Sequence, residues 1–168
     1  MKSIRKIIEY AFYIIIFLAI TFSIAFFRSG SRKLILDLSK YKPINTELAK
    51  DFESKNKVIY FWATWCGVCE TNLPMFKTSY RLFNGKWNTE FISIEEGSST
   101  PEYVKKYLDK NEILYPTIIA DSNLLQSNQI SGYPTIFFVN SQNEVKLIDT
   151  GLMSPVSMFI RILFLSLG

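Results

Sequence analysis

The sequence predicts an α/β domain in which helices flank a mixed central sheet, preceded by one apolar segment long enough to span a membrane. Two observations predict the α/β class. Apolar runs of strand length alternate with segments of helical periodicity, and a short polar turn joins the last two runs as a hairpin. A chain of 168 residues can also bury a core without disulfides. We therefore expect one domain behind one apolar segment.

The apolar segment at residues 10–27 reads YAFYIIIFLAITFSIAFF and carries no charge. As a helix it would extend roughly 27 Å, at about 1.5 Å per residue, which is near the thickness of the hydrocarbon core of a bilayer. The alternative is a cleaved signal peptide, because Ser23-Ile24-Ala25 fits a small-x-small cleavage site. Phe26 and Phe27 continue the apolar run beyond that site. We therefore predict an uncleaved transmembrane anchor that contacts the lipid bilayer.

Positive charges lie on both sides of this segment: Lys2, Arg5 and Lys6 precede it, and Arg28, Arg32 and Lys33 follow it. The positive-inside rule is thus nearly balanced. Because a short basic N-terminus in front of a first span usually stays in the cytoplasm, we predict that residues 1–9 are cytoplasmic. The rest of the chain is close to neutral and has no basic stripe, which argues against a nucleic-acid partner.

The remaining residues divide into a linker and a folded domain. Residues 28–40 are interpreted as a polar linker (29–33) followed by an edge strand (34–38), and residues 41–168 as the domain. Further strands are predicted at 58–62, 91–94, 117–120, 135–139 and 145–148, with a turn at 140–143. Helices are predicted at 45–54, from the CxxC at 66–69 through 83, from 100 onward and at 156–167, with a short helix or a turn at 121–129. In the helix after Thr100-Pro101-Glu102, four residues are expected to face inward: Tyr103, Val104, Tyr107 and Leu108.

The composition excludes several kinds of active site. With no histidine, the chain has no Ser-His-Asp or Cys-His nucleophile pair and no His-ligated zinc or haem. Two cysteines cannot form a disulfide framework or a four-cysteine zinc site within one chain. A single redox pair remains, and we expect neither a metal nor a cofactor beyond it.

That pair is Cys66-Gly67-Val68-Cys69, placed between a buried strand and the start of a helix. Residues three apart lie on one face of a helix, so the two sulfurs can close a disulfide. The helix N-terminus lowers the pKa of Cys66, which should attack a substrate disulfide, and Cys69 should resolve the mixed disulfide. Half of a zinc site completed by dimerisation, or two buried structural cysteines, are the alternatives.

Three sequence features around the pair resemble thioredoxin-like proteins. Phe61-Trp62-Ala63-Thr64-Trp65-Cys66-Gly67-Val68-Cys69 is similar to their active-site signature, Pro74 matches their helix proline, and Gly132-Tyr133-Pro134-Thr135 resembles their cis-proline segment. The Ala-Thr-Trp-Cys stretch looks like the membrane-tethered TlpA/ResA group. The Trp-Cys-Gly-Val-Cys variant is similar to its suppressor-for-copper-sensitivity protein D members.

The resemblance implies a thioredoxin-like fold and a thiol-disulfide oxidoreductase, held at the inner (cytoplasmic) membrane by a single span with its domain in the periplasm or outside the cell. It implies protein disulfides as substrates, a membrane electron donor of the DsbD type, and no cofactor except the Cys66-Cys69 disulfide. We expect Trp65, Tyr133 and Pro134 to bind the substrate. Pro134 would be cis and keep the rim flat, although an ordinary turn before a strand is the alternative.

Two positions depart from thioredoxin or lack a clear assignment. Tyr60 stands where thioredoxin has a buried Asp that assists proton transfer, so the acceptor for the proton of Cys69 is open. Glu95 and Glu96 follow the strand at 91–94, where some TlpA/ResA members carry an active-site acid, and they are our candidates for acid/base work. A solvated acidic pair at a strand end is the commoner explanation. Trp65 is expected to pack beside the sulfurs, and Trp62 to be core.

The sequence therefore predicts an anchored extracytoplasmic oxidoreductase that exchanges its dithiol with protein disulfides as a reductant. One alternative is a thiol oxidase of the DsbA kind, which the short stretch between the CxxC and Pro134 disfavours. The other is a non-catalytic thioredoxin-like module that binds copper or a partner through Cys66 and Cys69.

Overall fold

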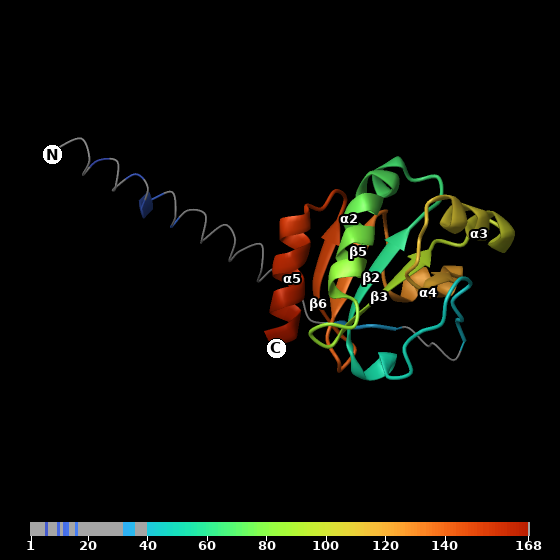
Figure 1. The fold of residues 1–168 in the computed structure, drawn as a ribbon, viewed down its shortest axis with the longest axis horizontal. Coiled ribbons are helices and arrows are strands. Elements are labelled where there is room, and N and C mark those ends of the chain that lie inside the picture. The colour runs from blue at the N-terminus through green and yellow to red at the C-terminus, as the bar shows by residue number, and fades with distance from the viewer. Residues whose placement is uncertain are drawn as a thin grey trace. The chain divides into compact units, whose positions relative to one another are not determined.

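The structure is a computed structural model that describes residues 6, 10, 12, 13 and 16, residues 32–35 and residues 40–167 (Figure 1). The chain divides into two compact units, Met1–Gly30 and Ser31–Gly168. Most of the predicted span at 10–27 lies outside the described residues. Among the residues that are described, no helix is both long and apolar enough to cross a bilayer.

The second unit is built on a six-stranded mixed sheet with the order β1-β6-β5-β2-β3-β4. The strands are β1 (Arg32–Lys33), β2 (Asn56–Trp62), β3 (Thr89–Glu95), β4 (Thr117–Ile119), β5 (Thr135–Val139) and β6 (Glu144–Thr150). The central strands β2, β3 and β4 run parallel, and β5, β6 and β1 are added antiparallel. The predicted α/β class, the mixed sheet and the hairpin between β5 and β6 are confirmed.

Within residues 40–167, four α-helices and one 3₁₀-helix accompany these strands. They are η1 (Phe52–Ser54), α2 (Gly67–Phe83), α3 (Pro101–Lys110), α4 (Ser122–Ser127) and α5 (Pro155–Leu167). Capping residues set several of their starts: the Thr100 hydroxyl accepts from the N–H of Tyr103 before Pro101, and the Asp121 carboxylate accepts from the N–H of Leu124. The predicted helices at these places are confirmed.

The contacts of alternate residues of β2 show which helices cover each face of the sheet. Asn56 donates to the carbonyl of Leu165 in α5 (3.2 Å), Tyr60 stacks on Phe76 of α2, and Trp62 packs against α3. These three helices therefore lie on one face, with α2 and α5 side by side (Figure 1). The odd-numbered residues of β2 point to the other face, which is covered by α4 and the segment before η1.

Three predictions about local structure were wrong. The edge strand is formed by Arg32–Lys33, inside the predicted linker, because these residues pair with β6. Leu34 and Ile35 are not in a strand, and residues 36–38 of the predicted strand lie outside the described residues. Residues 45–54 contain only η1, since the side chain of Asn45 bonds to the backbone around β4 and holds that segment as a loop. Tyr103 is exposed on α3, whereas Val104 and Leu108 are buried as expected.

Candidate active site

Cys66 and Cys69 form a disulfide at the N-terminus of α2, with their Cα atoms 5.2 Å apart. Cys66 is the N-cap residue of the helix. Residues 63–65 connect it to the carboxyl end of β2. Both cysteines are buried, Cys69 more deeply than Cys66. The placement predicted from the CxxC spacing, between a core strand and a helix start, is therefore what the structure has.

The helix N-terminus provides a polar environment for the sulfur of Cys66. The backbone N–H of Cys69 donates to Cys66 Sγ (3.1 Å), so a side-chain sulfur stands where a hydroxyl or carboxylate oxygen caps most helices. An N–H donor and the positive end of the helix dipole both favour a negative charge on this sulfur once the disulfide is reduced. The arrangement supports a thiolate at Cys66, and Cys69 lies one turn further in.

Two buried side chains hold the first turns of α2 in place. The Tyr60 hydroxyl donates to the carbonyl of Cys69 (3.1 Å) from the strand beneath. Burial raises the pKa of Tyr60, so this hydroxyl stays protonated and acts as a donor. Asn72 donates to the carbonyl of Gly151 (2.8 Å) and accepts from the N–H of Met153 (3.1 Å). Asn72 thus fastens the loop between β6 and α5 to the helix that carries the cysteines.

Asn72 is not among the site residues that the sequence predicts. An asparagine inside an amphipathic helix is usually a surface residue, and the loop that it binds lies about 80 positions further along the chain. Tyr60 was noted only as a departure from thioredoxin. The hydrogen bond that gives it a place in the site depends on how α2 packs over β2.

The rim beside Cys66 is formed by Trp65, Tyr133 and Pro134. The rings of Trp65 and Tyr133 meet edge to face with their centres 6.0 Å apart. The Tyr133-Pro134 bond is cis, as the sequence predicts, and the carbonyl of Pro134 accepts from the N–H of Gly151 (2.9 Å). Residue 135 pairs with Phe61 of β2, so this turn ends beside the strand that leads to Cys66.

Trp65 differs from its expected packing. Its ring is 66% exposed, and its indole N–H donates to Glu96 Oε1 (2.9 Å). The ring is therefore a surface feature of the rim, available to a bound molecule. Trp62 is buried as predicted, and its N–H donates to the hydroxyl of Ser93 (3.2 Å).

Glu95 and Glu96 lie in different environments, so the interpretation of a solvated acidic pair holds for neither in full. Glu95 is completely buried at the end of β3, opposite Trp62, and one carboxylate oxygen accepts from the N–H of Gly97 (2.9 Å). Its other oxygen has no hydrogen-bond partner among the described residues. Burial raises the pKa of Glu95 above its usual value, and the negative charge of Glu96 adds to that effect.

Gly97 shapes the turn that follows Glu95. Its φ of 88° lies in the left-handed region, and a Cβ there would come within 2.1 Å of the carbonyl oxygen of Ala120. Only glycine fits this position without a shift of the backbone. The N–H of Gly97 is thereby held against the buried carboxylate.

Metal ligands do not gather anywhere in the described part of the chain, since no group of three or more His, Cys, Asp or Glu residues is close enough to hold an ion. Within those residues the chemistry of the site rests on the two sulfurs, one buried carboxylate and the aromatic rim.

Comparison with known proteins places this geometry in a family. Residues 26–159 match the model of the Redoxin family. The chain is 28% identical over 105 residues to the thiol-disulfide oxidoreductase ResA of Geobacillus kaustophilus, covering 62% of this chain and 59% of that protein. It is 26% identical over 105 residues to ResA of Bacillus subtilis, covering 62% and 58%. The chain thus matches somewhat less than two thirds of the length of these relatives.

Solved structures share the fold at lower identity. StoA from Bacillus subtilis superimposes with a TM-score of 0.64 at 17% identity, over 79% of this chain and 96% of that one. A thiol-disulfide isomerase from Corynebacterium glutamicum gives a TM-score of 0.69 at 17% identity, over 80% and 95%. The thioredoxin-like fold and the resemblance to the TlpA/ResA group are confirmed, and the narrower similarity to suppressor-for-copper-sensitivity protein D stays a prediction.

Proposed function

The chain belongs to the Redoxin family, and we propose that it is a thiol-disulfide oxidoreductase that reduces disulfides in proteins outside the cytoplasm. The observation that carries the proposal is the Cys66-Cys69 disulfide at the N-terminus of α2. A redox pair needs one sulfur that is activated as a thiolate and a second within bonding distance, and the capped helix end supplies both.

The proposed reaction transfers two electrons from the reduced pair to the substrate. The Cys66 thiolate attacks one sulfur of a substrate disulfide, forms a mixed disulfide and releases the first substrate thiolate. Cys69 then loses its proton and attacks Cys66 Sγ, which re-forms the Cys66-Cys69 disulfide and releases the second substrate thiolate. Both released thiolates take up protons. The pair must afterwards be reduced by a dithiol donor, for which we propose a membrane protein of the DsbD type.

Glu95 is our proposal for the group that accepts the proton of Cys69. It is a buried carboxylate on the face of the sheet that α2 covers, and its raised pKa brings its proton affinity closer to that of a thiol. Tyr60 is a poor alternative, because its hydroxyl is occupied by the carbonyl of Cys69 and its pKa is raised. The chain has no histidine to take this role.

The rim of the site would bind the substrate. Trp65 offers exposed and Tyr133 partly exposed aromatic surface beside Cys66. The backbone of Tyr133 precedes the start of β5, beyond the pair of Thr135 with Phe61, and there an extended peptide can pair as an added strand. A protein segment that carries a disulfide fits this shape. Glu96 would act here by orienting the indole of Trp65.

The proposed location rests on the sequence of residues 10–27. Its 18 uncharged residues favour a single span of the inner membrane, with the folded unit in the periplasm or outside the cell. Flotation of the full chain with liposomes, before and after washing with sodium carbonate at pH 11, tests the anchor. A protein removed from the vesicles by carbonate would contradict it.

Replacement of Cys69 by Ala tests catalysis itself. The variant should accumulate mixed disulfides through Cys66, visible as bands that disappear on reduction, and Cys66→Ala in the same strain is the matched control. A non-catalytic module that binds copper or a partner through both sulfurs would trap no covalent partner, and that result would refute the enzymatic proposal.

The direction of electron flow needs a separate measurement. Rapid acid quenching of intact cells followed by a mass-tagging thiol reagent reports the redox state of the pair. Mostly reduced thiols are expected if a donor feeds the protein. A mostly oxidised pair in cells that contain the donor would instead indicate a thiol oxidase.

A further inference from the structure

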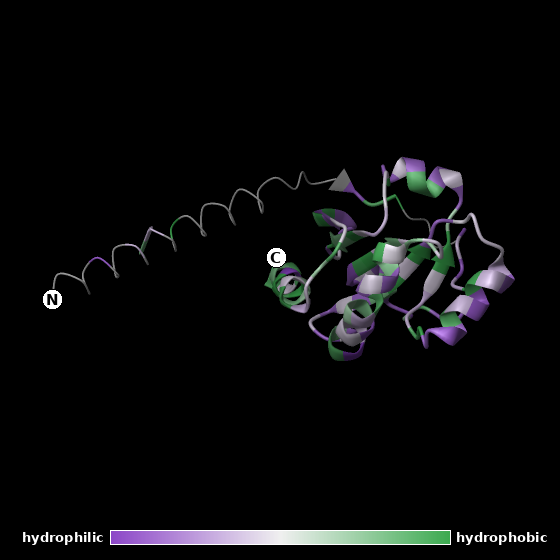
Figure 2. Ribbon diagram, turned by 90° about the horizontal axis from the view of Figure 1, so that it is seen from above, coloured by the Kyte–Doolittle hydropathy of each residue, from purple (hydrophilic) through white to green (hydrophobic). Residues whose placement is uncertain are grey.

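Helix α5 carries apolar residues on both of its sides. Met158, Ile162 and Leu165 are buried against the sheet and α2. On the opposite side, Val156, Ile160, Leu163 and Leu167 follow one another at steps of three and four residues, with Phe159 and Phe164 on the two flanks, and all six are exposed. We call these six residues the α5 outer face. In Figure 2, where this helix is seen nearly end-on beside the C-terminus, its ribbon is mostly green.

The single charge of α5 does not reach this face. Arg161 is turned toward the sheet, where its guanidinium donates to Asp149 of β6 (2.8 Å) and to the hydroxyl of Ser157. A helix that is hydrophobic all round normally lies in the interior of a protein or against lipid. Val156 and Leu167 are 67% and 79% exposed, so no segment among the described residues covers this apolar surface.

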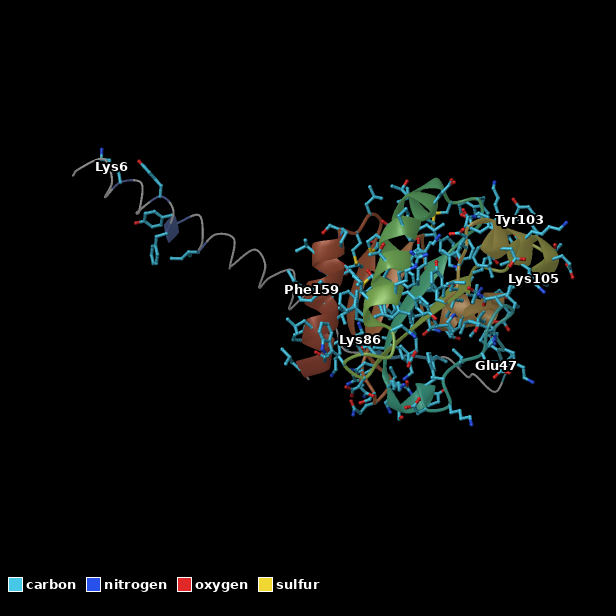
Figure 3. The ribbon with its side chains drawn as sticks, viewed as in Figure 1. Lys6, Glu47, Lys86, Tyr103, Lys105 and Phe159 are labelled. Atoms are coloured by element: carbon cyan, nitrogen blue, oxygen red, sulfur yellow. A yellow bond between two sulfur atoms is a disulfide. The ribbon has the colours of Figure 1, made fainter. Side chains whose placement is uncertain are left out.

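An aromatic cluster extends the α5 outer face at one flank. The ring of Phe159 lies 5.9 Å from Phe83 at the end of α2 and 6.1 Å from Trp87 in the following turn. Lys86, labelled in Figure 3, directly precedes Trp87 in that turn. Tryptophan and phenylalanine with a lysine at the edge are typical of surfaces that rest in the interfacial region of a bilayer.

The length of the chain limits how far the domain can move from its anchor. The apolar segment ends at Phe27 and the first strand begins at Arg32, so at most about 17 Å of extended chain separates them, at roughly 3.4 Å per residue. Strand β1 pairs with β6, and β6 is the strand to which Arg161 of α5 is bonded. Helix α5 packs over β5 and β2 beside α2, so the attachment point lies at the edge of the half of the sheet that α5 covers.

We propose that the α5 outer face docks on the surface of the lipid bilayer, with Trp87 in the headgroup region. The proposal rests on the membrane anchor of the proposed function. Residues 28–31, the short tether between the apolar segment and β1, would keep the α5 outer face at a high local concentration of lipid. Modest burial of apolar area would then be enough for docking. Cys66 lies at the far end of the 17-residue helix α2, about 25 Å from Phe83 at 1.5 Å per residue, and stays clear of the docked surface.

Tryptophan quenching by brominated lipids tests the docking. The chain has three tryptophans, none of them in residues 10–27, so the fluorescence of the full chain in liposomes reports on the folded unit alone. We expect lower fluorescence in liposomes that contain lipids brominated at carbons 6 and 7 than in unbrominated ones. Trp87→Phe should abolish this difference, because Trp62 is buried and Trp65 lies at the other end of α2.

A pair of variants separates docking from mere nearness to the membrane. Val156→Glu with Leu167→Gln changes the two most exposed residues of the face and should restore the fluorescence of Trp87. Leu114→Glu alters an exposed leucine (61%) outside the face and should leave the quenching unchanged. Quenching that persists in the double variant would overturn the proposal, since the tether alone would then explain it.

Two further results would also overturn it, and they are distinguishable from failure of the anchor. A chain that resists carbonate extraction but shows no quenching of Trp87 is anchored without docking. If such a chain also forms dimers in detergent that the double variant abolishes, the face belongs to a second copy. A chain that does not float with liposomes has neither an anchor nor a lipid-binding face.

Discussion

The two faces of the central sheet use the same strands in opposite ways. On the face that α2 covers, β2 and β3 present polar groups among aromatic rings: Tyr60, Trp62, Ser93 and Glu95. On the other face the alternate residues Ile59, Phe61, Ile92 and Ile94 of the same strands form an apolar cluster. The buried Lys57 lies on this face at the other end of β2, where its ammonium donates to two backbone carbonyls and to the side chain of Asn143. Successive residues of one strand therefore alternate in role: one faces α2 and the site, and the next packs in the apolar core on the other face.

The polar groups are arranged at one end of the sheet. Tyr60 bonds to the backbone of Cys69, and Glu95 lies at the carboxyl end of β3, beside the strand that leads to the cysteines. A buried carboxylate with one unpaired oxygen costs stability, whereas the apolar cluster beneath adds it. The stability that the apolar cluster contributes would therefore offset the stability lost on the face that α2 covers, which we call the functional face. Substitutions on each face can test this.

Glu95→Gln should have the largest effect on activity and little effect on the fold. If Glu95 takes the proton of Cys69, loss of that base should slow the resolving step by about 100- to 10,000-fold. The mixed disulfide should then accumulate in the variant, as measured by single-turnover reaction with a peptide disulfide and quenching in acid. Glu96→Gln, which keeps a hydrogen-bond acceptor for Trp65, is the matched control. Equal rates for the two variants would assign the proton to another group.

The same substitution should change how stability depends on pH. Because the pKa of Glu95 is raised in the folded state, the folded chain binds more protons than the unfolded chain between about pH 4.5 and the folded pKa. The free energy of unfolding should therefore fall as the pH rises through that window. In Glu95→Gln this contribution is absent, which urea unfolding at several pH values can measure. If the free energy of unfolding depended on pH in the same way in the variant and the parent, Glu95 would take up no proton on folding.

Ile92→Ala on the apolar face should show the opposite pattern. Ile92 is completely buried in the cluster, and its truncation should lower the free energy of unfolding by about 2–5 kcal/mol. The activity per folded molecule should stay close to that of the parent, because the side chain points away from α2. Leu114→Ala, at an exposed leucine, should change stability by less than about 0.5 kcal/mol. Strong loss of specific activity in Ile92→Ala would break the division between the faces.

The sequence predicted most of this fold because its strongest signals are local. The apolar run at 58–62 and the CxxC that follows it identify a strand, a helix start and a redox pair within a dozen residues. β1 was misplaced because two residues show no periodicity, and its position depends on pairing with β6. The segment 45–54 was misinterpreted because Asn45 bonds to residues some 70 positions away.

The polar contacts of the site were beyond prediction for a similar reason. The hydrogen bond from Tyr60 to Cys69, and those from Asn72 to the loop at 151–153, depend on tertiary packing that no sequence spacing encodes. Glu95 is buried because β3 is covered on both faces along its whole length, and Glu96 is the first residue after that strand. The difference between the two glutamates therefore requires the end of β3 to be known.

Two tyrosines on the functional face give the finest test, with the smallest expected effect. Tyr60 and Tyr115 are both completely buried and both pack on Phe76, but only Tyr60 has a hydrogen-bond partner among the described residues. Tyr60→Phe should lower the free energy of unfolding of the oxidised protein by about 0.5–1.5 kcal/mol. Tyr115→Phe removes an unpaired buried hydroxyl and should be neutral or stabilising.

Urea unfolding of both variants, compared with the parent under non-reducing conditions, measures this difference. A larger loss in Tyr60→Phe would mean that a polar group on the functional face is stabilising when it is paired to α2. Equal losses in the two variants would mean that the tyrosine rings alone support the helix, and that the bond to the carbonyl of Cys69 serves only to orient the turn that holds the two sulfurs.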